Sequence, residues 1–411
     1  MMRFLRGWAA APSLTFAVLL LSLFGVAMIY SAGVLNVPSP VTENIWQRQL
    51  LWLFLGLGVF TAVALIPTRW TEWAALPAYV GAMLLLMATL VIGTGAGTAA
   101  GVKSWISLGG FRFQPAEVAK IATVLAVARF FSVRREAVQN LRELLAPLAI
   151  VGLPLGLVIL QPDLGTALAF IGILFAMLYW GGTPVPLLVL LASPGLALIL
   201  SYDTIIWSVY IVLLTLSLFF YRYRLYLVES VAVVLANLAS GTIALPLWRS
   251  LDDYQRNRLL VFLDPTVDPR GAGWQIIQSK VAIGSGGLLG KGFTQGTQKR
   301  LDFLPEQHTD FIFSVIGEEI GFLGTSLVIV AFTFILIRLV QLAGRAKDPF
   351  AGLVIFGIFG AWITHIFVNI GMTVGVVPIT GIPLPFVSYG GSFLLMSWVA
   401  LAVAVRVSQE Q

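Results

Sequence analysis

The chain has 411 residues, of which 58% are hydrophobic and 11% carry a charge. A soluble domain carries about 25% charged residues, so this composition, with a mean hydropathy of +0.93, excludes an ordinary soluble enzyme and predicts a polytopic membrane protein. Because the chain has no cysteine and only two histidines, His308 and His365, disulfides, thiolate metal sites and a histidine-rich metal site are excluded. The net charge of +6 is expected to reflect Lys and Arg in cytoplasmic loops rather than nucleic-acid binding.

About twelve apolar segments follow one another along the chain, judged by the roughly 20 apolar residues that a helix needs to cross a bilayer. The first resembles a signal peptide, but its apolar run continues to about Tyr30 without a clear cleavage site, which predicts a retained first span. The segment at 311–340 is too long for one span and is expected to be tilted or to lie partly outside the bilayer. The predicted spans are 13–33, 47–66, 73–93, 115–131, 145–160, 164–181, 184–200, 205–220, 226–247, 311–340, 351–370 and 384–405.

The distribution of Lys and Arg in the short loops predicts the orientation of the chain. With the N-terminus inside, nearly all positive charges of the short loops fall on the cytoplasmic side, with Lys103 and Arg112 as exceptions. Both termini are therefore expected inside and the long polar stretch 249–310 outside. No internal repeat is visible, which disfavours a transporter built from inverted repeats.

The stretch 249–310 carries most of the polar residues whose pattern suggests a site. It contains two Asp-Pro pairs, beginning at Asp264 and Asp268, and such pairs are typical of turns. The second is followed by the glycine-containing run 270–273, where the backbone could approach a ligand closely. The glycine-rich run 284–291 does not match the phosphate-loop pattern, so a nucleotide site is not expected.

A second group of charges lies where the external segment 101–120 enters a helix. Pro115 suits the first helical turn, and Glu117 and Lys120 are three residues apart, so they share a helix face and could pair. One interpretation is an ion pair that snorkels to the membrane interface. The presence of Arg112 five residues before Glu117 favours the other, a polar cavity.

Asp163 lies between two apolar segments, in the sequence QPDLGTAL. A carboxylate at this depth costs several kcal/mol unless it is paired or solvated. It could cap the helix that follows, and it could also face the same cavity as Glu117 and Lys120.

Two further patterns are more readily explained by structure than by chemistry. Helix capping by Thr309 or Asp310 before the apolar run at 311 is a strong alternative to any catalytic role of His308. The stretch 369–392 has prolines and glycines in an apolar context, so it cannot form one straight helix. It predicts a broken or re-entrant segment, buried in protein or lining a cavity.

Three blocks of the sequence together resemble the SEDS family (shape, elongation, division and sporulation), and the likeness covers essentially the whole chain, closest to the RodA branch. They begin with KSWISLGGFRFQPAEVAKIA, DPTVDPRGAGWQIIQSKVAIGSGG and NIGMTVGVVPITGIPLPFVSYGGS. The resemblance implies one all-α SEDS transmembrane domain over 1–411, with ten family helices. The sequence departs from this by about 40 residues within 184–247, which predict two extra helices, followed by the large extracytoplasmic loop 249–310.

The resemblance also implies a function. Members of the family are peptidoglycan glycosyltransferases that polymerise lipid II for cell-wall elongation and cell shape, in the bacterial inner membrane, together with a class B penicillin-binding protein. It places the essential aspartate at Asp268 and a membrane cavity at Arg112, Glu117 and Lys120, with Asp163 as the aspartate of the QPDLGT block. A lipid II flippase and a non-catalytic scaffold of the elongation complex are the alternatives.

The chemistry of the reaction is consistent with these residues. Because diphosphate is a good leaving group, cationic stabilisation can replace the acid partner of a glycosidase, and one carboxylate suffices as general base. We expect Asp268 to be this base in a reaction that inverts the anomeric carbon. Glu117 and Asp163 would orient the cations or hold Mg²⁺ or Mn²⁺, and the remaining substrate-binding candidates are Arg112, Lys120, Arg258, Arg270 and Gln278.

Overall fold

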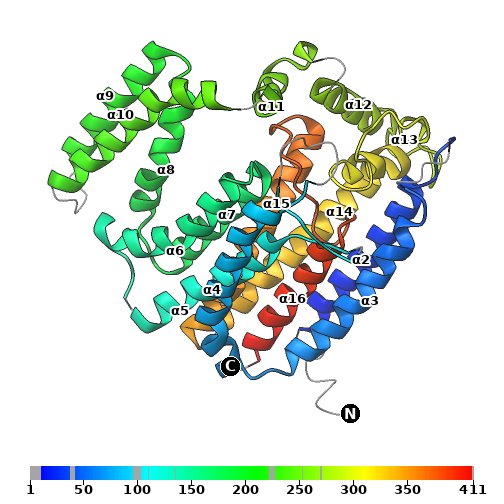
Figure 1. The fold of residues 1–411 in the computed structure, drawn as a ribbon, viewed down its shortest axis with the longest axis horizontal. Helices are drawn as coiled ribbons and strands as arrows, with labels where there is room; N and C mark the ends of the chain where they lie inside the picture. The colour runs from blue at the N-terminus through cyan, green and yellow to red at the C-terminus, as the bar shows by residue number, and fades with distance from the viewer. Residues whose placement is uncertain are drawn as a thin grey trace.

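The computed structural model describes residues 11–37, 42–95, 103–109, 111–134, 136–221, 227–251, 253–268 and 271–409. Within these ranges, twelve helices of 16 to 34 residues form the body of the molecule (Figure 1), and each coincides with one of the predicted spans. The predicted all-α polytopic membrane fold is confirmed. The helices are α2 (Pro12–Ala32), α3 (Ile45–Ala64), α4 (Thr68–Ile92), α5 (Pro115–Arg134), α6 (Leu141–Ile159), α7 (Leu164–Trp180), α8 (Val185–Leu200), α9 (Thr204–Tyr221), α10 (Leu227–Ser250), α14 (Ile312–Arg345), α15 (Pro349–Val374) and α16 (Gly391–Val407).

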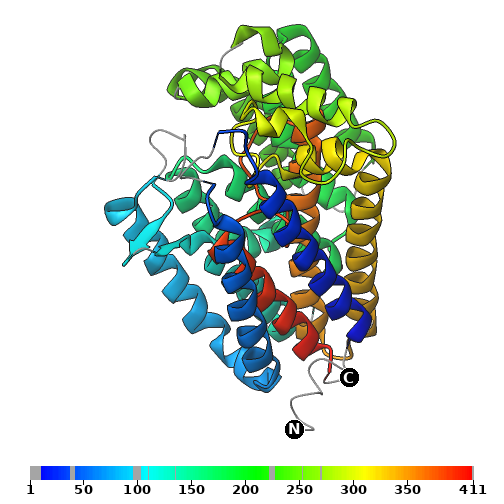
Figure 2. The same cartoon turned by 90° about the vertical axis from the view of Figure 1, so that its right-hand side faces the viewer.

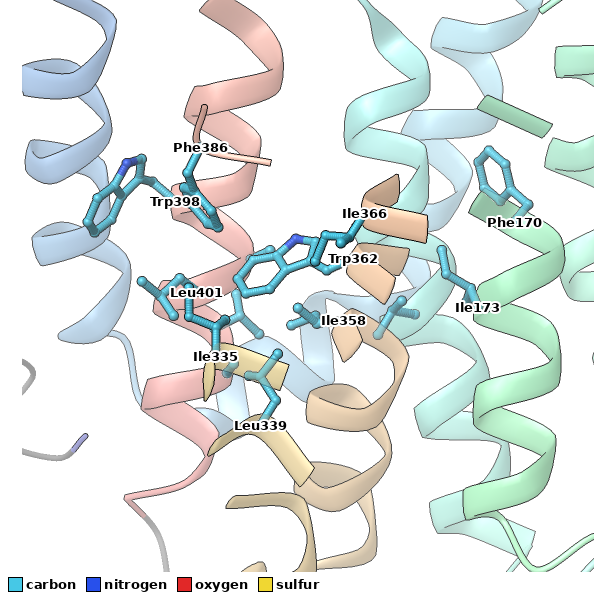
Figure 3. Packing of buried hydrophobic residues seen from close by; sticks show 14 of the residues in the cluster. Phe170, Ile173, Ile335, Leu339, Ile358, Trp362, Ile366, Phe386, Trp398 and Leu401 are labelled. Atoms are coloured by element: carbon cyan, nitrogen blue, oxygen red, sulfur yellow. The ribbon is translucent and has the colours of Figure 1, made fainter. Parts of the chain in front are cut away.

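The centre of the bundle is α15. In its most apolar stretch 72% of the residues are buried, against 11% in the corresponding stretch of α10, and it packs against α5, α7, α14 and α16. Trp362 of α15 makes an edge contact with Phe386, with ring centroids 5.0 Å apart, and Phe386 in turn contacts Trp398 of α16 (Figure 3). Side chains projecting from α15 are therefore held on most sides by neighbouring helices.

The helices α8, α9 and α10 pack on one another at one side of the bundle (Figure 1). A polar contact inside this group joins Asn237 to Ser193, whose Oγ accepts from the Asn237 amide at 2.8 Å, and to Tyr210. Many of their apolar side chains are exposed, as expected of helices that face lipid. These three helices occupy the region 184–247; that two of them are additional to the family's ten stays a prediction.

The polar stretch after α10 folds into short helices rather than an open loop. These are α11 (Asp253–Leu263), the 3-10 helix η1 (Pro265–Val267), α12 (Ala272–Ser285) and α13 (Thr297–Arg300). They lie across one end of the bundle, opposite the end at which α2 begins and α16 ends (Figures 1 and 2). This arrangement agrees with a topology in which both termini lie on the same side of the membrane, away from the polar stretch.

The overlong apolar segment at 311–340 is explained by a break within α14. Gly321 has φ 71° and ψ −163°, which interrupts the helix. The N–H groups of Lys291 and Gly292 donate to the carbonyls just before the break, and the carbonyls of residues 287 and 288 accept from the N–H groups just after it. The loop after α12 thus replaces the lost helical hydrogen bonds, while the expectation that the segment is tilted or lies partly outside the bilayer stays a prediction.

The predicted interruption near the C-terminus is confirmed. The helix α15 ends at Val374, Gly375 takes the left-handed conformation with φ 78°, and the chain is non-helical until α16 begins. Much of this segment is buried, and side chains form hydrogen bonds with its backbone N–H and C=O groups. Gln49 of α3 donates to the Ser388 carbonyl and accepts from the N–H of Gly390, while the Ser388 hydroxyl accepts from the N–H of Leu384.

Candidate functional site

A buried ion pair lies in the first turns of α5. Pro115 begins the helix, and Nζ of Lys120 lies 2.9 Å from Oε2 of Glu117. Both residues are almost completely buried, with 4% exposure for Glu117 and 6% for Lys120. The predicted pairing is confirmed, and the burial shows that the pair is turned into the protein instead of snorkelling to its surface.

The same lysine meets a histidine that the sequence interpretation left without a role. Nε2 of His365 in α15 lies 2.9 Å from Nζ of Lys120, and Nδ1 lies 3.1 Å from the carbonyl oxygen of Pro383. Its ring stacks on Phe393 of α16. A histidine inside an otherwise apolar span was the available signal, since polar groups at such positions are rare and often functional.

A small pocket between α5, α15 and α16 brings these groups together. Glu117, Lys120 and His365 form its polar part, and apolar side chains form the rest. The pocket thus places the Lys120 ammonium, paired with the Glu117 carboxylate, beside apolar walls that suit the apolar body of a lipid-linked ligand. The other lining residues are Ile121, Val124, Ile358, Ala361, Trp362, Phe393, Met396, Ser397 and Ala400.

Asp163 caps α7, as one of its two interpretations predicted. Its Oδ1 accepts from the N–H of Thr166 at 3.0 Å, and its Oδ2 accepts from the Gln114 amide at 2.9 Å. Since Gln114 immediately precedes α5, this bond ties the start of α7 to the start of the helix that carries the ion pair. Asp163 does not line the pocket.

Arg112 lies apart from the pair. It belongs to a short hairpin of β1 (Ile106–Leu108) and β2 (Phe111–Phe113), which was not predicted, and it faces Ser107 across the two strands. Its side chain is exposed, and it is not among the residues that line the pocket. The structure thus unites two of the three charges expected in the cavity, and substrate binding by Arg112 stays a prediction.

Asp268 lies between η1 and the N-terminus of α12 and is partly buried. Its carboxylate accepts from the N–H groups of Gly271 at 2.9 Å and of Ala272 at 3.0 Å. Asp264 similarly accepts from the N–H of Thr266 within η1. Both Asp-Pro aspartates therefore organise turns, and Asp268 in addition has its carboxylate orientation fixed at a helix N-terminus.

The remaining candidates of this region have different surroundings. Gln278 is buried on α12, and Arg270 lies outside the described residues. The helix α12 is joined to α15, because Ser279 donates to the carbonyl of Thr373 at 2.7 Å. The element that carries Asp268 is thus fixed to the element that carries His365, although Asp268 does not line the pocket.

Asp310, for which the sequence favoured a structural role, lies among charged groups just before α14. Burial, followed by the neighbouring carboxylates of Glu306 and Asp163, raises its pKa to about 7, and the Arg258 guanidinium partly opposes this. The helix α14 has no side-chain cap, so the capping hypothesis for Thr309 and Asp310 is wrong. The long-range contacts of Asp310 give it a setting that its sequence neighbours did not reveal.

No group of three or more His, Cys, Asp or Glu side chains in the described part of the chain is arranged to hold a metal ion. Of the two predicted ligands, Glu117 pairs with Lys120 through Oε2 and Asp163 accepts from Gln114 and Thr166. The donor set therefore does not fit a metal ion held by the protein alone.

The fold and the site define a polytopic helical membrane protein with a polar pocket between its central helices and a helical, glycine-rich polar layer across one end. The chain matches the family model of FtsW, RodA and SpoVE, described as cell cycle protein, over residues 12–213 and 204–411. It belongs to this family, and the predicted SEDS membership is confirmed.

Relatives with assigned names cover nearly the whole chain. It is 35% identical over 380 residues to the peptidoglycan glycosyltransferase MrdB of Escherichia coli K12, a match that covers 92% of this chain and 90% of the relative. It is 33% identical to the peptidoglycan glycosyltransferase RodA of Treponema pallidum, over 97% of each chain. A probable peptidoglycan glycosyltransferase FtsW of Geobacter metallireducens is 34% identical, over 94% of this chain and 92% of the relative.

Solved structures share the fold. One was determined in a study of the structural coordination of polymerization and crosslinking by a peptidoglycan synthase complex; it is 29% identical, with a TM-score of 0.69 and coverage of 97% of both chains. The crystal structure of the rod shape determining protein RodA of Thermus thermophilus is 25% identical, with a TM-score of 0.63 and coverage of 97% of this chain and 96% of the other.

Proposed function

We propose that this protein is a peptidoglycan glycosyltransferase that polymerises lipid II into glycan strands for cell-wall elongation. The observation that carries the proposal is its identity of 35% to a peptidoglycan glycosyltransferase over 92% of this chain and 90% of the relative. The pocket between α5, α15 and α16 supports it, because the Lys120 ammonium, held by Glu117, lies beside apolar walls, an arrangement that suits a diphosphate that carries a lipid.

The proposed reaction is a single displacement at the anomeric carbon of the donor sugar. The acceptor's 4-hydroxyl oxygen forms the new bond to that carbon, the bond to the diphosphate oxygen breaks, and the diphosphate leaves with the electron pair. The configuration inverts from α to β. Asp268 takes the hydroxyl proton as general base. Its carboxylate receives two backbone N–H bonds, and each of its oxygens keeps a lone pair for a substrate hydroxyl.

The charge that develops on the diphosphate would be stabilised by cationic side chains. Lys120 is the candidate that the pocket supports, and Arg112, Arg258 and Arg270 remain further candidates. Mg²⁺ or Mn²⁺ stays in the proposal only as an ion that would enter with the diphosphate, because Mg²⁺ can take most of its ligands from water and substrate phosphates.

The proposed setting is the bacterial inner membrane, with both termini cytoplasmic and the layer of α11, α12 and α13 outside. The proposed partner is a class B penicillin-binding protein that crosslinks the new strands. Support comes from the structurally similar protein studied in a synthase complex that coordinates polymerization and crosslinking.

Purified protein, alone and with its transpeptidase partner, should convert lipid II into glycan polymer that is resolved by gel electrophoresis. Asp268→Asn should abolish polymerisation and lower the melting temperature only slightly, because the Asn side chain can accept from one of the two backbone N–H groups but not from both. The matched control is Asp264→Asn, which changes the other Asp-Pro aspartate and keeps a residue that caps helices well, so it should retain most of the activity.

The outcomes separate the alternatives. Absence of polymer from wild-type protein with its partner would refute the enzyme and leave the flippase and the scaffold, of which only the flippase would move lipid II across vesicle membranes. Polymerisation by Asp268→Asn would instead refute Asp268 as the base.

A further inference from the structure

We infer that His365 is a positioning residue, which holds the Lys120 ammonium at the wall of the pocket and keeps one of its protons free for an anionic ligand. The inference deepens the proposed function and rests on it. The basis is a chain of contacts that runs from the interrupted segment after α15 through His365 and Lys120 to Glu117.

The partners of the imidazole determine which of its nitrogens carries the proton. The carbonyl oxygen of Pro383 can only accept, so Nδ1 at 3.1 Å must donate to it. A charged lysine has no acceptor, so Nε2 at 2.9 Å from its Nζ must accept. Both conditions hold for a neutral His365 that is protonated on Nδ1.

The contacts of Lys120 then leave one direction open. An ammonium group has three N–H donors, of which Glu117 and His365 take two. The third has no hydrogen-bond acceptor among the described residues, although the ammonium also lies 5.3 Å from the centre of the Phe393 ring, and it borders the pocket that these residues line. Since Lys carries a flexible four-carbon stem, the two contacts keep its charge in one place, which is the preorganisation that electrostatic catalysis requires.

The interrupted segment between α15 and α16 helps to hold the His365 imidazole in place. Pro383 lies between α15 and α16, and the His365 ring stacks on Phe393 in the first turn of α16. The imidazole is thus held on one edge by irregular backbone and on one face by a helix, with 2% of its surface exposed. The position of Lys120 therefore depends on residues on three separate elements.

Two substitutions of His365 each keep one of the two hydrogen bonds of the imidazole and remove the other. In His365→Gln the amide oxygen reaches the place of Nε2 and can accept from Lys120. In His365→Asn the shorter amide reaches only the place of Nδ1 and can donate to Pro383. We expect His365→Gln to polymerise lipid II within about threefold of wild type and His365→Asn to lose about 10- to 100-fold in kcat, because small misplacements of a catalytic charge have effects of this size. The KM for lipid II should change little in either.

A spectroscopic test is independent of activity. The chain has two histidines, so ¹⁵N-histidine labelling gives two sets of ring signals, and His365→Gln assigns them. His365 should show the Nδ1-protonated neutral form, and Lys120→Met should shift the signal of its Nε2, with His308 as the internal reference.

An Nε2-protonated or charged His365 in the wild-type protein would overturn the inference without any activity measurement, and so would an Nε2 signal that does not change in folded Lys120→Met. Equal activity of the Gln and Asn variants would also overturn it. Wild-type protein that forms no polymer would refute the proposed function, while the nitrogen signals would still test the contact between His365 and Lys120.

Discussion

Buried Lys–Glu pairs occur in two regions of this molecule, and their surroundings differ. Lys120 and Glu117 line a pocket, whereas Lys299 and Glu319 lie at the break in α14 with no exposed surface. In this second region, named here the break cluster (Ser31, Lys299 and Glu319), Nζ of Lys299 also donates to the carbonyl and the hydroxyl of Ser31, whose hydroxyl donates to Glu319.

Burial of a charge therefore does not by itself identify a functional site. In the break cluster all three protons of Lys299 have protein partners, so nothing is left for a ligand, and the contacts join α2, α13 and α14. In the pocket, Lys120 has two polar partners among the described residues and borders the pocket. A buried ion pair whose lysine uses all its N–H donors within the protein therefore indicates a structural role. One whose lysine has an N–H donor facing a pocket indicates a ligand-binding site.

Removing each lysine tests this comparison most strongly. Lys299→Met should lower the free energy of unfolding by roughly 3–5 kcal/mol, because it leaves the buried Glu319 carboxylate without a cation. Lys120→Met should lower it less, since water can enter the pocket beside Glu117, but should reduce polymerisation by about 100-fold or more. Thermal unfolding in one detergent and polymerisation of lipid II measure the two effects.

The double variant Lys299→Met with Glu319→Leu provides the control and should recover most of the lost stability, because apolar replacement of a whole buried pair is often neutral. Equal losses of stability in Lys299→Met and Lys120→Met would contradict the distinction between the two regions.

The break in α14 can be tested through its glycine. Gly321→Ala should destabilise by roughly 1–3 kcal/mol, because only glycine adopts its backbone conformation without strain and a Cβ would lie 2.3 Å from the N atom of Gly290. Gly344→Ala, in the regular part of the same helix with its nearest neighbour at 4.0 Å, should be neutral or stabilising by up to about 1 kcal/mol. Melting temperatures of the two variants compare them directly. Similar values would show that the break does not organise the cluster.

Asp310 lies outside both regions, and its titration should give the smallest change in the free energy of unfolding. Its folded-state pKa of about 7 is above the ordinary value of 3.8, so the folded protein holds the proton more tightly than the unfolded chain does, and its contribution to stability falls as the pH rises between these values. At about 1.4 kcal/mol per pKa unit, wild type should lose about 1 kcal/mol between pH 6 and pH 8 relative to Asp310→Asn. Melting curves at both pH values measure this difference, and a difference that does not change with pH would contradict the raised pKa.

Most of the helical framework could be predicted because hydropathy is a property of consecutive residues. All twelve predicted spans coincide with helices, and the Glu117–Lys120 pair follows from helical periodicity alone. The interruption between α15 and α16 was similarly evident from its prolines and glycines. The break at Gly321 was not, because one glycine in a long apolar run has no local signature until another segment supplies its hydrogen bonds.

Local sequence was sufficient to predict the class of protein, the spans, the local pairs and the turns at Asp264 and Asp268, since each depends on residues close together in the chain. Three features became visible only from the packing of the helices. Lys120 contacts His365, which is 245 residues away, and Arg112 lies outside the pocket. All three N–H donors of Lys299 have protein acceptors, whereas Lys120 has two such acceptors among the described residues. These features depend on how separate helices pack, and many arrangements of the same apolar faces satisfy hydropathy equally well. The chemical meaning of a buried charge therefore depends on contacts that the order of residues does not contain.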